Sequence, residues 1–95
     1  MWITVATPPM TDLALFDKIC AAAGDPAGAL ARYAGPAGDG RLRVVVLWES
    51  QAHAEAFFAD KLGPAIATVL GPEPMGRPEV VGITVEREYV AAPAA

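Results

Sequence analysis

The sequence predicts a single α+β domain in which a four-stranded antiparallel sheet carries two helices on one face. Segments rich in β-branched residues alternate with segments of helical periodicity, in the order strand, helix, strand, strand, helix, strand. A loop rich in Gly and Pro separates the two middle strands, which is typical of a hairpin. The length of 95 residues is that of one domain.

The first strand and helix are expected in the N-terminal quarter of the chain. Residues 2–7 are rich in β-branched and aromatic side chains, and the Pro-Pro pair at 8–9 should stop this strand. Thr11 is the expected N-cap of a helix, because its hydroxyl can accept a hydrogen bond from the first turn. Apolar side chains then recur at helical spacing until Gly24, which we expect to end the helix.

The middle of the chain predicts a β-hairpin. Residues 29–34 form a short expected strand, and residues 35–40 (Gly-Pro-Ala-Gly-Asp-Gly) have the composition of a turn. Residues 41–48 contain Leu-Arg-Val-Val-Val-Leu-Trp, the clearest strand signal in the protein.

A second helix and a last strand complete the predicted domain. Ser50 is the expected cap of a helix over residues 51–62, which a Gly-Pro pair at 63–64 should interrupt before a continuation through residue 70. Residues 71–78 hold three prolines and two glycines and are expected to be a loop. Residues 80–90 read as the final strand.

This order of elements, βαββαβ, is the ferredoxin-like topology. We expect one such domain over residues 1–90 and a flexible C-terminal tail over residues 91–95. Both helices should lie on one face of the sheet, which leaves the other face to be covered. The chain is 54% hydrophobic and only 19% charged, so a second copy is the expected cover and a homodimer the expected assembly.

Charge and cysteine content exclude several functional classes. Seven Lys and Arg against eleven Asp and Glu give a net charge of −4, which argues against nucleic acid or an anionic membrane as partner. The single Cys20 cannot form an internal disulfide. The N-terminal residues lack the basic region and long apolar core of a signal peptide, and no apolar stretch approaches the ~20 residues of a membrane span. We therefore expect a cytoplasmic protein.

Three segments carry a resemblance to a known family. They are Leu-Trp-Glu-Ser at 47–50, Ala-Phe-Phe at 56–58 and Lys-Leu-Gly-Pro-Ala at 61–65, with the hairpin loop at 34–40 in support. This pattern resembles the dimeric α+β barrel superfamily, in particular small proteins similar to antibiotic-biosynthesis monooxygenases. The likeness extends over residues 29–66 and continues elsewhere in topology alone.

The resemblance implies a dimer whose two sheets pack face to face, with a cavity between sheet and helices in each subunit. Activities in the family include cofactor-independent oxygenation of aromatic polyketides, polyketide cyclisation, isomerisation and haem breakdown. This chain has no Asn, so the Asn-Trp-His set of the haem-degrading members cannot be assembled. Arg32 stands where relatives often carry a His in the second strand, and Arg87-Glu88 replaces a His-Asn pair near the end of the last strand.

Residue counts exclude several kinds of catalytic site. The chain has one His, one Cys and one Ser, and Ser50 with His53 is better explained as a helix cap than as part of a triad. One His and one Cys are too few for a zinc site. The glycines at 35–40 precede a strand rather than a helix, so they do not form a phosphate loop. We expect no metal, flavin, nicotinamide or other cofactor.

Aromatic and titratable residues are the candidates that remain. Trp48 shares a strand face with two valines, so it and Phe57 are candidate walls of a ligand cavity, although core packing would also explain them. His53 is the default general acid or base because only its unperturbed pKa lies near neutrality. A solvent-facing histidine on the first helical turn is the alternative.

Two arginines and two tyrosines complete the candidate site. Arg87 falls on the predicted strand face that carries Val81 and Ile83, so it needs a carboxylate partner or an anionic ligand. Arg32 could play the same part, or either arginine could form a structural ion pair. Tyr33 and Tyr89 are candidate hydrogen-bond donors to a phenolic substrate, or strand residues of high β propensity.

The sequence and the resemblance together predict a small-molecule enzyme of bacterial secondary metabolism. It would be a cofactor-independent oxygenase or a polyketide cyclase or isomerase that binds a planar apolar substrate between sheet and helices. Trp48 would stack on the ligand, Arg32 or Arg87 would steady a negative charge, and His53 would move a proton. The alternative is a non-catalytic homodimer that binds a metabolite or serves as an accessory protein.

Overall fold

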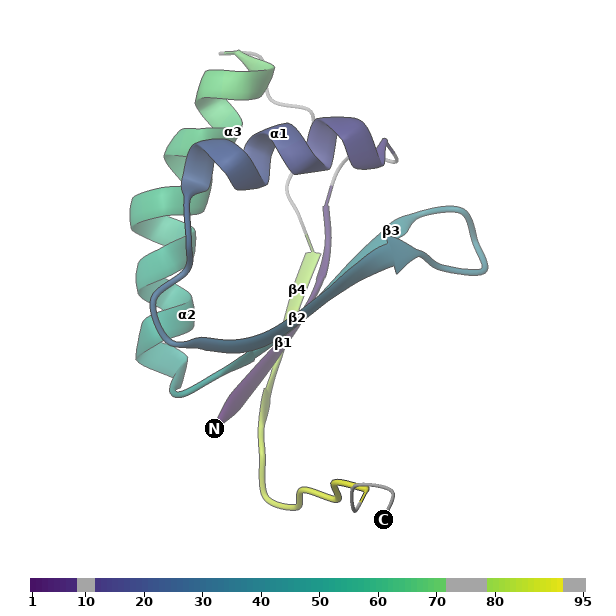
Figure 1. The fold of residues 1–95 in the computed structure, drawn as a ribbon, viewed down its shortest axis with the longest axis vertical. Helices are drawn as coiled ribbons and strands as arrows, with labels where there is room; N and C mark the ends of the chain where they lie inside the picture. The colour runs from purple at the N-terminus through teal and green to yellow at the C-terminus, as the bar shows by residue number, and fades with distance from the viewer. Residues whose placement is uncertain (9–11, 72–78, 92–95) are drawn as a thin grey trace.

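The computed structural model describes residues 1–8, 12–71 and 79–91. One sheet forms the base of the molecule, and all the helices lie on one side of it (Figure 1). In chain order the elements are β1 (Trp2–Thr7), α1 (Leu13–Ala23), β2 (Ala29–Pro36), β3 (Leu42–Trp48), α2 (Gln51–Phe57), the π-helical turn η1 (Phe58–Leu62), α3 (Gly63–Leu70) and β4 (Glu79–Thr84).

The sheet has the strand order β2-β3-β1-β4, and every neighbouring pair is antiparallel. Thr4 in the central strand β1 lies opposite Val46 of β3 on one side and opposite Gly82 of β4 on the other. The α+β ferredoxin-like fold predicted from the order of elements is therefore confirmed.

Helix α1 begins and ends close to the predicted positions. Its N-cap is Asp12, whose carboxylate accepts a hydrogen bond of 2.9 Å from the Ala14 N–H. Thr11, the predicted cap, lies outside the described residues. The helix ends at Gly24, which has a φ of +78° and donates its N–H to the Cys20 carbonyl, a conformation that favours glycine.

The second helical region is continuous, which corrects the interruption predicted at Gly63. Ser50 caps α2 as predicted by accepting from the His53 N–H. The π-helical turn η1 then joins α2 to α3, with the Gly63 N–H bonded to the Phe58 carbonyl. Pro64 lies in the first turn of α3, where a backbone N–H has no carbonyl partner within the helix. Its missing N–H therefore costs α3 no hydrogen bond. Because the π-helical turn η1 is wider than an α-helical turn, it accommodates Pro64 and the helix continues.

Two strand boundaries differ from the prediction. Strand β2 is longer than predicted and continues to Pro36 because it pairs with β3 as far as Leu42. Strand β4 ends at Thr84, so the strand predicted to residue 90 is wrong beyond that point. The register with β1 ends at the pair Trp2–Thr84, and the Val85 N–H bonds to the Met1 carbonyl just beyond it.

Two parts of the prediction fall largely outside the described residues. They are the loop at 71–78, of which only Gly71 is described, and the tail at 91–95, of which only Ala91 is described. In the described part of the chain, no helix combines the length and the apolar character needed to cross a bilayer.

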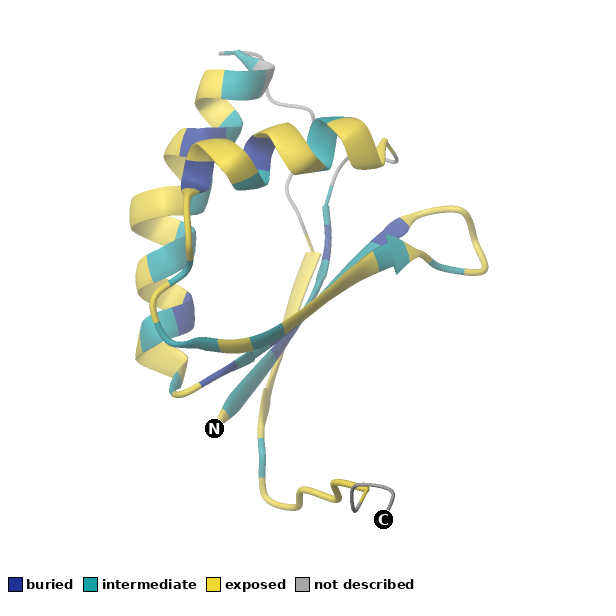
Figure 2. Ribbon diagram, viewed as in Figure 1, coloured by how far each residue is buried: buried dark blue, intermediate teal, exposed yellow. Residues whose placement is uncertain are grey.

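The core lies on the helix side of the sheet, as the distribution of buried residues in Figure 2 shows. One buried cluster joins α1 and α3, and it contains Ile19, Ala23, Leu42 and Ala65. A second cluster joins β3 to α2, and it contains Val46, Trp48 and Ala54. Between the two clusters the helices and the sheet diverge, and this is where the candidate site lies.

Candidate functional site

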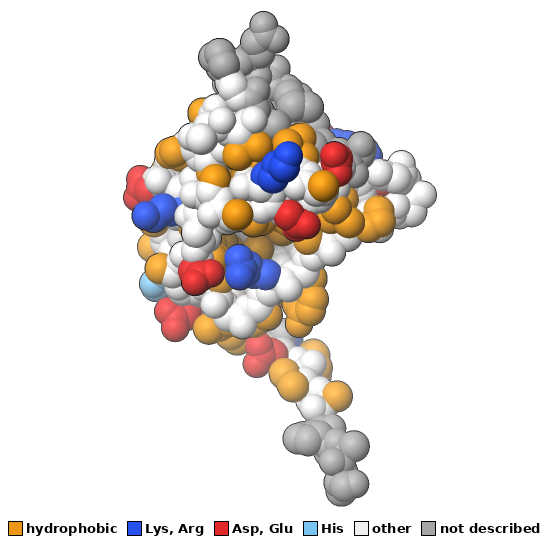
Figure 3. Space-filling model, turned by 45° about the horizontal axis from the view of Figure 1, so that its top comes forward, with side chains coloured by type: hydrophobic (Ala, Val, Ile, Leu, Met, Phe, Trp, Pro, Cys, Tyr) orange, Lys and Arg blue, Asp and Glu red, His pale blue; other side chains and the backbone are white. Residues whose placement is uncertain are grey.

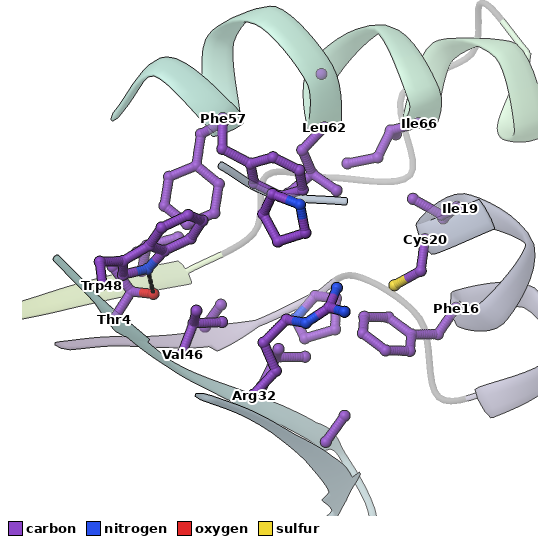
Figure 4. Close-up of a pocket in the computed structure, with 18 of the residues that line it drawn as sticks. Thr4, Phe16, Ile19, Cys20, Arg32, Val46, Trp48, Phe57, Leu62 and Ile66 are labelled. Carbon is purple, nitrogen blue, oxygen red and sulfur yellow. Dashed lines mark hydrogen bonds between the residues drawn. The ribbon is translucent and has the colours of Figure 1, made fainter. Parts of the chain in front are cut away.

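A cavity of about 460 Å³ separates the sheet from the helices (Figure 4). This volume is within the range of small-molecule binding sites. Its walls are almost entirely apolar and come from strands, from α1 and from the long second helical region. They include Phe16, Ile19, Val44, Val46, Phe57, Phe58, Leu62 and Ile66.

Strand alternation determines which residues reach the cavity. Thr4 of β1 and Val46 of β3 are register partners, and side chains two residues apart on each strand share the same face. Trp48 lies two residues after Val46, so its side chain also projects toward the helices, on the strand face that the sequence predicted it to share with Val46. Arg32 of β2 is the register partner of Val46, and register partners point to the same face of a sheet. Arg32 is therefore on the face that borders the cavity.

Trp48 forms one end of the cavity and is completely buried. Its indole Nε1–H donates a hydrogen bond of 3.0 Å to Thr4 Oγ1. Its ring centroid lies 5.6 Å from that of Phe57 and 6.0 Å from that of Phe58, in tilted and edge-to-face arrangements. Because the indole is completely covered by protein and its N–H is already bonded, the half-buried rings of Phe57 and Phe58 give this end of the cavity its aromatic surface, and it offers a ligand no hydrogen bond.

Arg32 stands toward the other end of the cavity and is exposed to solvent. Figure 4 shows its guanidinium extending from β2 toward Phe16 and Cys20 of α1. Within the described ranges Arg43 pairs with Asp39, and His53 Nε2 lies near Glu49, so no described carboxylate lies within ion-pair distance of Arg32. The described lining therefore carries a single formal charge, and that charge is positive.

Cys20 also lines the cavity, beside Arg32. Burial raises the pKa of its thiol, while the Arg32 cation lowers this pKa and the nearby Asp17 carboxylate raises it. The neutral thiol is thus the favoured form. The position of Cys20 in the site was not predicted from the sequence, because helical spacing alone does not tell a packed stripe from a cavity wall.

The structure places His53 outside this cavity, at the start of α2. Its Nδ1 lies 2.8 Å from Ser50 Oγ, and its Nε2 lies 3.7 Å from the Glu49 carboxylate. The imidazole packs against Gly28, where even a Cβ atom would collide with the ring. These contacts join the helix cap to the start of β2, so the observed surroundings of His53 are structural.

Arg87 and Tyr89 also lie outside the cavity, in the segment that follows β4. Arg87 is exposed and donates a 2.8 Å hydrogen bond from Nη1 to the backbone carbonyl of Glu86. Tyr89 is 91% exposed. The predicted strand face that would have aligned Arg87 with Ile83 does not form, because β4 has already ended at Thr84.

Tyr33 borders the cavity but is 68% exposed, because it alternates with Arg32 and faces away from the helices. Within one subunit the structure thus brings together Trp48, Phe57 and Arg32 from the predicted set. It adds Thr4, Cys20 and Phe16, which the sequence did not single out.

The remaining charges form no metal site among residues 1–8, 12–71 and 79–91, where no three His, Cys, Asp or Glu side chains gather closely enough to hold an ion. On the face shown in Figure 3, acidic and basic side chains lie interspersed with apolar ones rather than in separate patches. Neither sign of charge dominates that face.

Comparison with known proteins gives a consistent result at the level of fold. No family model matches the sequence, and no curated protein does. Among solved structures, an antibiotic biosynthesis monooxygenase superposes with a TM-score of 0.64 at 14% identity, over 92% of this chain and 100% of the other. A protein of unknown function from Nitrosomonas europaea gives a TM-score of 0.62 at 17% identity, over 96% and 93% of the two chains.

A third solved structure contains a ligand. It is the monooxygenase ActVA-Orf6 of Streptomyces coelicolor in complex with nanaomycin D, with a TM-score of 0.59, 24% identity and coverage of 96% and 91%. At these identities the likeness concerns the fold. The chain has the fold of the antibiotic-biosynthesis-monooxygenase-like proteins, as the motif around Trp48 predicted.

Proposed function

We propose that this protein is a small-molecule enzyme that binds a planar, largely apolar substrate between its sheet and its helices. The reaction would be a cofactor-independent oxygenation or a cyclisation or isomerisation of a polyketide type of substrate. The observation that carries the proposal is the 460 Å³ cavity with aromatic walls, on a fold shared with monooxygenases. Flat rings stack favourably on such walls.

Arg32 is the residue of the lining best suited to assist a reaction. A guanidinium that contacts the substrate would stabilise an oxyanion or enolate as negative charge develops there. His53 and Arg87 lie outside the cavity of the subunit, so the proposal rests on Arg32 alone for charge stabilisation. With Cys20 held as a neutral thiol, the described lining offers no ready general base, and the substrate proton would have to leave to water.

The same proposal includes a homodimer. The sheet face turned away from the helices carries apolar side chains from three strands, among them Val45 and Leu47 of β3 and Val81 and Ile83 of β4. An apolar face of this extent is unusual on a subunit that functions alone. Light scattering at micromolar concentration is expected to give twice the mass of one chain.

A non-catalytic role is the second candidate function. It is favoured by the composition of the cavity wall, where the described lining holds a single charged side chain among nineteen residues. A binding protein needs only a matching surface, whereas an enzyme needs at least one group positioned on the reacting atoms. The two candidates therefore differ in whether Arg32 promotes turnover.

The experiment that separates them measures binding and turnover of one planar phenol, 1,3-dihydroxynaphthalene. Binding is followed by tryptophan fluorescence in a Trp2→Phe background, and turnover by oxygen uptake and by mass spectrometry of the products with and without oxygen. The enzyme proposal expects turnover above the uncatalysed rate that falls in Arg32→Met and persists in Arg41→Met, whose site lies outside the cavity. Binding without turnover for this and related naphthols would favour the non-catalytic role, and absence of binding would contradict both.

A further inference from the structure

We propose that the cavity selects ligands with one negative charge and binds them in one orientation, with a carboxylate or ionised phenol at Arg32 and a flat apolar body at the aromatic end formed by Phe57, Phe58 and Trp48. This inference rests on the proposed function, because it assumes that the cavity is the ligand site. It adds the charge of the ligand and the direction in which it lies.

The charge follows from the surroundings of Arg32. The chain has eleven acidic and seven basic residues, so carboxylates outnumber the cations available to pair with them. Even so, no described carboxylate reaches Arg32, whereas Arg43 on the other face of the sheet is paired with Asp39 at 2.9 Å. A guanidinium with no partner among the described carboxylates, at the edge of an apolar space, is a ready partner for an incoming anion.

The orientation follows from the difference between the two ends of the cavity. Trp48 is fully buried, and its N–H is already bonded to Thr4, so a charged group placed there would lose its hydration and gain no partner. At Arg32 a charged group keeps contact with solvent and gains a cation. A ligand charged at one end therefore has one favourable direction.

The number of charges follows from what lies beside Arg32. Arg32 is the one charged side chain in the described lining of the cavity. A second negative charge on the ligand would find no second cation in the described lining and would lose its hydration against apolar walls. A cationic ligand would be repelled by Arg32. One negative charge is the best match.

The test compares two probes of the same shape, 2-naphthoate and the neutral 2-naphthamide, by tryptophan fluorescence in the Trp2→Phe background. The wild-type cavity is expected to bind the carboxylate roughly tenfold more tightly than the amide, as is typical of a charge-assisted hydrogen bond. Arg32→Met should remove this preference and leave binding of the amide unchanged. Arg41→Met, which removes the same charge from the hairpin turn, should keep the preference.

Orientation is tested with two brominated forms of the carboxylate, because bromine quenches tryptophan only at short range. 6-Bromo-2-naphthoate, with bromine far from the carboxylate, should quench Trp48 more strongly at saturation than 1-bromo-2-naphthoate, with bromine beside it. The reverse order would show that the charged end points to Trp48 and would overturn the proposed orientation.

The outcomes separate this inference from the proposed function. If the amide binds in the cavity as tightly as the carboxylate, or if Arg32→Met keeps the preference, the charge selection is wrong and the cavity remains the ligand site. If neither probe changes the fluorescence, the cavity is not a ligand site and both proposals fail.

Discussion

The two faces of the sheet are built from the same strands and end in opposite environments. On the helix side Thr4 and Trp48 are buried, and the space left between strands and helices is the cavity. On the other side Val81 is 61% exposed and Ile83 is 47% exposed. In Figure 2 the buried residues lie in the helices and in the central strands β1 and β3, whereas the edge strand β4 is exposed along its length.

The difference shows that alternation alone does not assign a solvent face. An antiparallel sheet with one face in water usually alternates apolar and polar residues along its strands. Strand β3 instead places Val44 and Val46 toward the helices and Val45 and Leu47 away from them, so both faces are apolar. The helices provide one cover, and the second cover is the proposed partner subunit.

Removing the Trp48 side chain should have the largest effect on the helix side. Trp48→Ala removes a fully buried ring and leaves the Thr4 hydroxyl without its donor. The free energy of unfolding is expected to fall by about 3–5 kcal/mol, as for other buried aromatic truncations. Urea denaturation followed by circular dichroism measures this change. Trp48→Phe keeps a ring in place and should cost less, and a loss below about 1 kcal/mol in Trp48→Ala would show that this end of the core is loosely packed.

A charge on the open face tests the second cover. Ile83→Glu places a carboxylate where the proposed partner subunit packs, and burial of an unpaired charge is expected to weaken dimerisation at least about a hundredfold. Light scattering over a dilution series should then report the mass of one chain. Ala52→Glu, which adds the same charge on exposed α2, is the control and should remain dimeric. A wild-type protein that is monomeric at all concentrations would rule out the dimer.

The sequence was sufficient to predict those elements whose signals are local. The run of valines before Trp48 identified β3 and its helix-facing residues, and Ser50 identified the start of α2. The end of β4 was predicted wrongly because it depends on pairing with β1, a strand that is distant in the sequence: Val85 bonds to Met1, eighty-four residues earlier. A strand continues only where a neighbour supplies hydrogen-bond partners.

The candidate site was less predictable than the fold for a similar reason. Arg32 and Tyr33 are adjacent, so they point to opposite sides of the sheet, and only the register with Val46 decides which one reaches the cavity. Phe16 and Cys20 lie on a helical stripe whose periodicity is the same whether it packs tightly or borders an empty space. Both features depend on how separate elements meet.

A glycine on β4 offers a smaller test of packing on the helix side. A Cβ atom at Gly82 would collide with the indole of Trp2, which lies across the neighbouring strand. Gly82→Ala is therefore expected to lower the free energy of unfolding by about 1–3 kcal/mol, the usual range for overpacking. Gly35→Ala is the matched control, because a Cβ there meets nothing within 4 Å. Equal effects of the two substitutions in thermal melts would show that Trp2 does not rest on Gly82.

The smallest expected effect concerns the reactivity of Cys20, and it tests the electrostatics at the Arg32 end of the cavity. Iodoacetamide reacts with the thiolate, so the pH dependence of alkylation reports the pKa of the thiol. Burial raises this pKa, so the midpoint in the folded protein should lie above that of the unfolded chain in denaturant.

The two charged neighbours of Cys20, Arg32 and Asp17, determine whether a substitution raises or lowers the pKa of the thiol. Arg32→Met removes a cation that stabilises the thiolate, so the pKa should rise further and alkylation at a fixed pH below the midpoint should slow. Asp17→Asn removes an anion that opposes the thiolate, so the pKa should fall and alkylation should become faster. Arg41→Met should leave the profile unchanged. Opposite shifts from Arg32→Met and Asp17→Asn would place both charges beside the thiol. Identical profiles in all three variants would mean that the Arg32 guanidinium points away from the cavity in solution and does not have the role proposed for it.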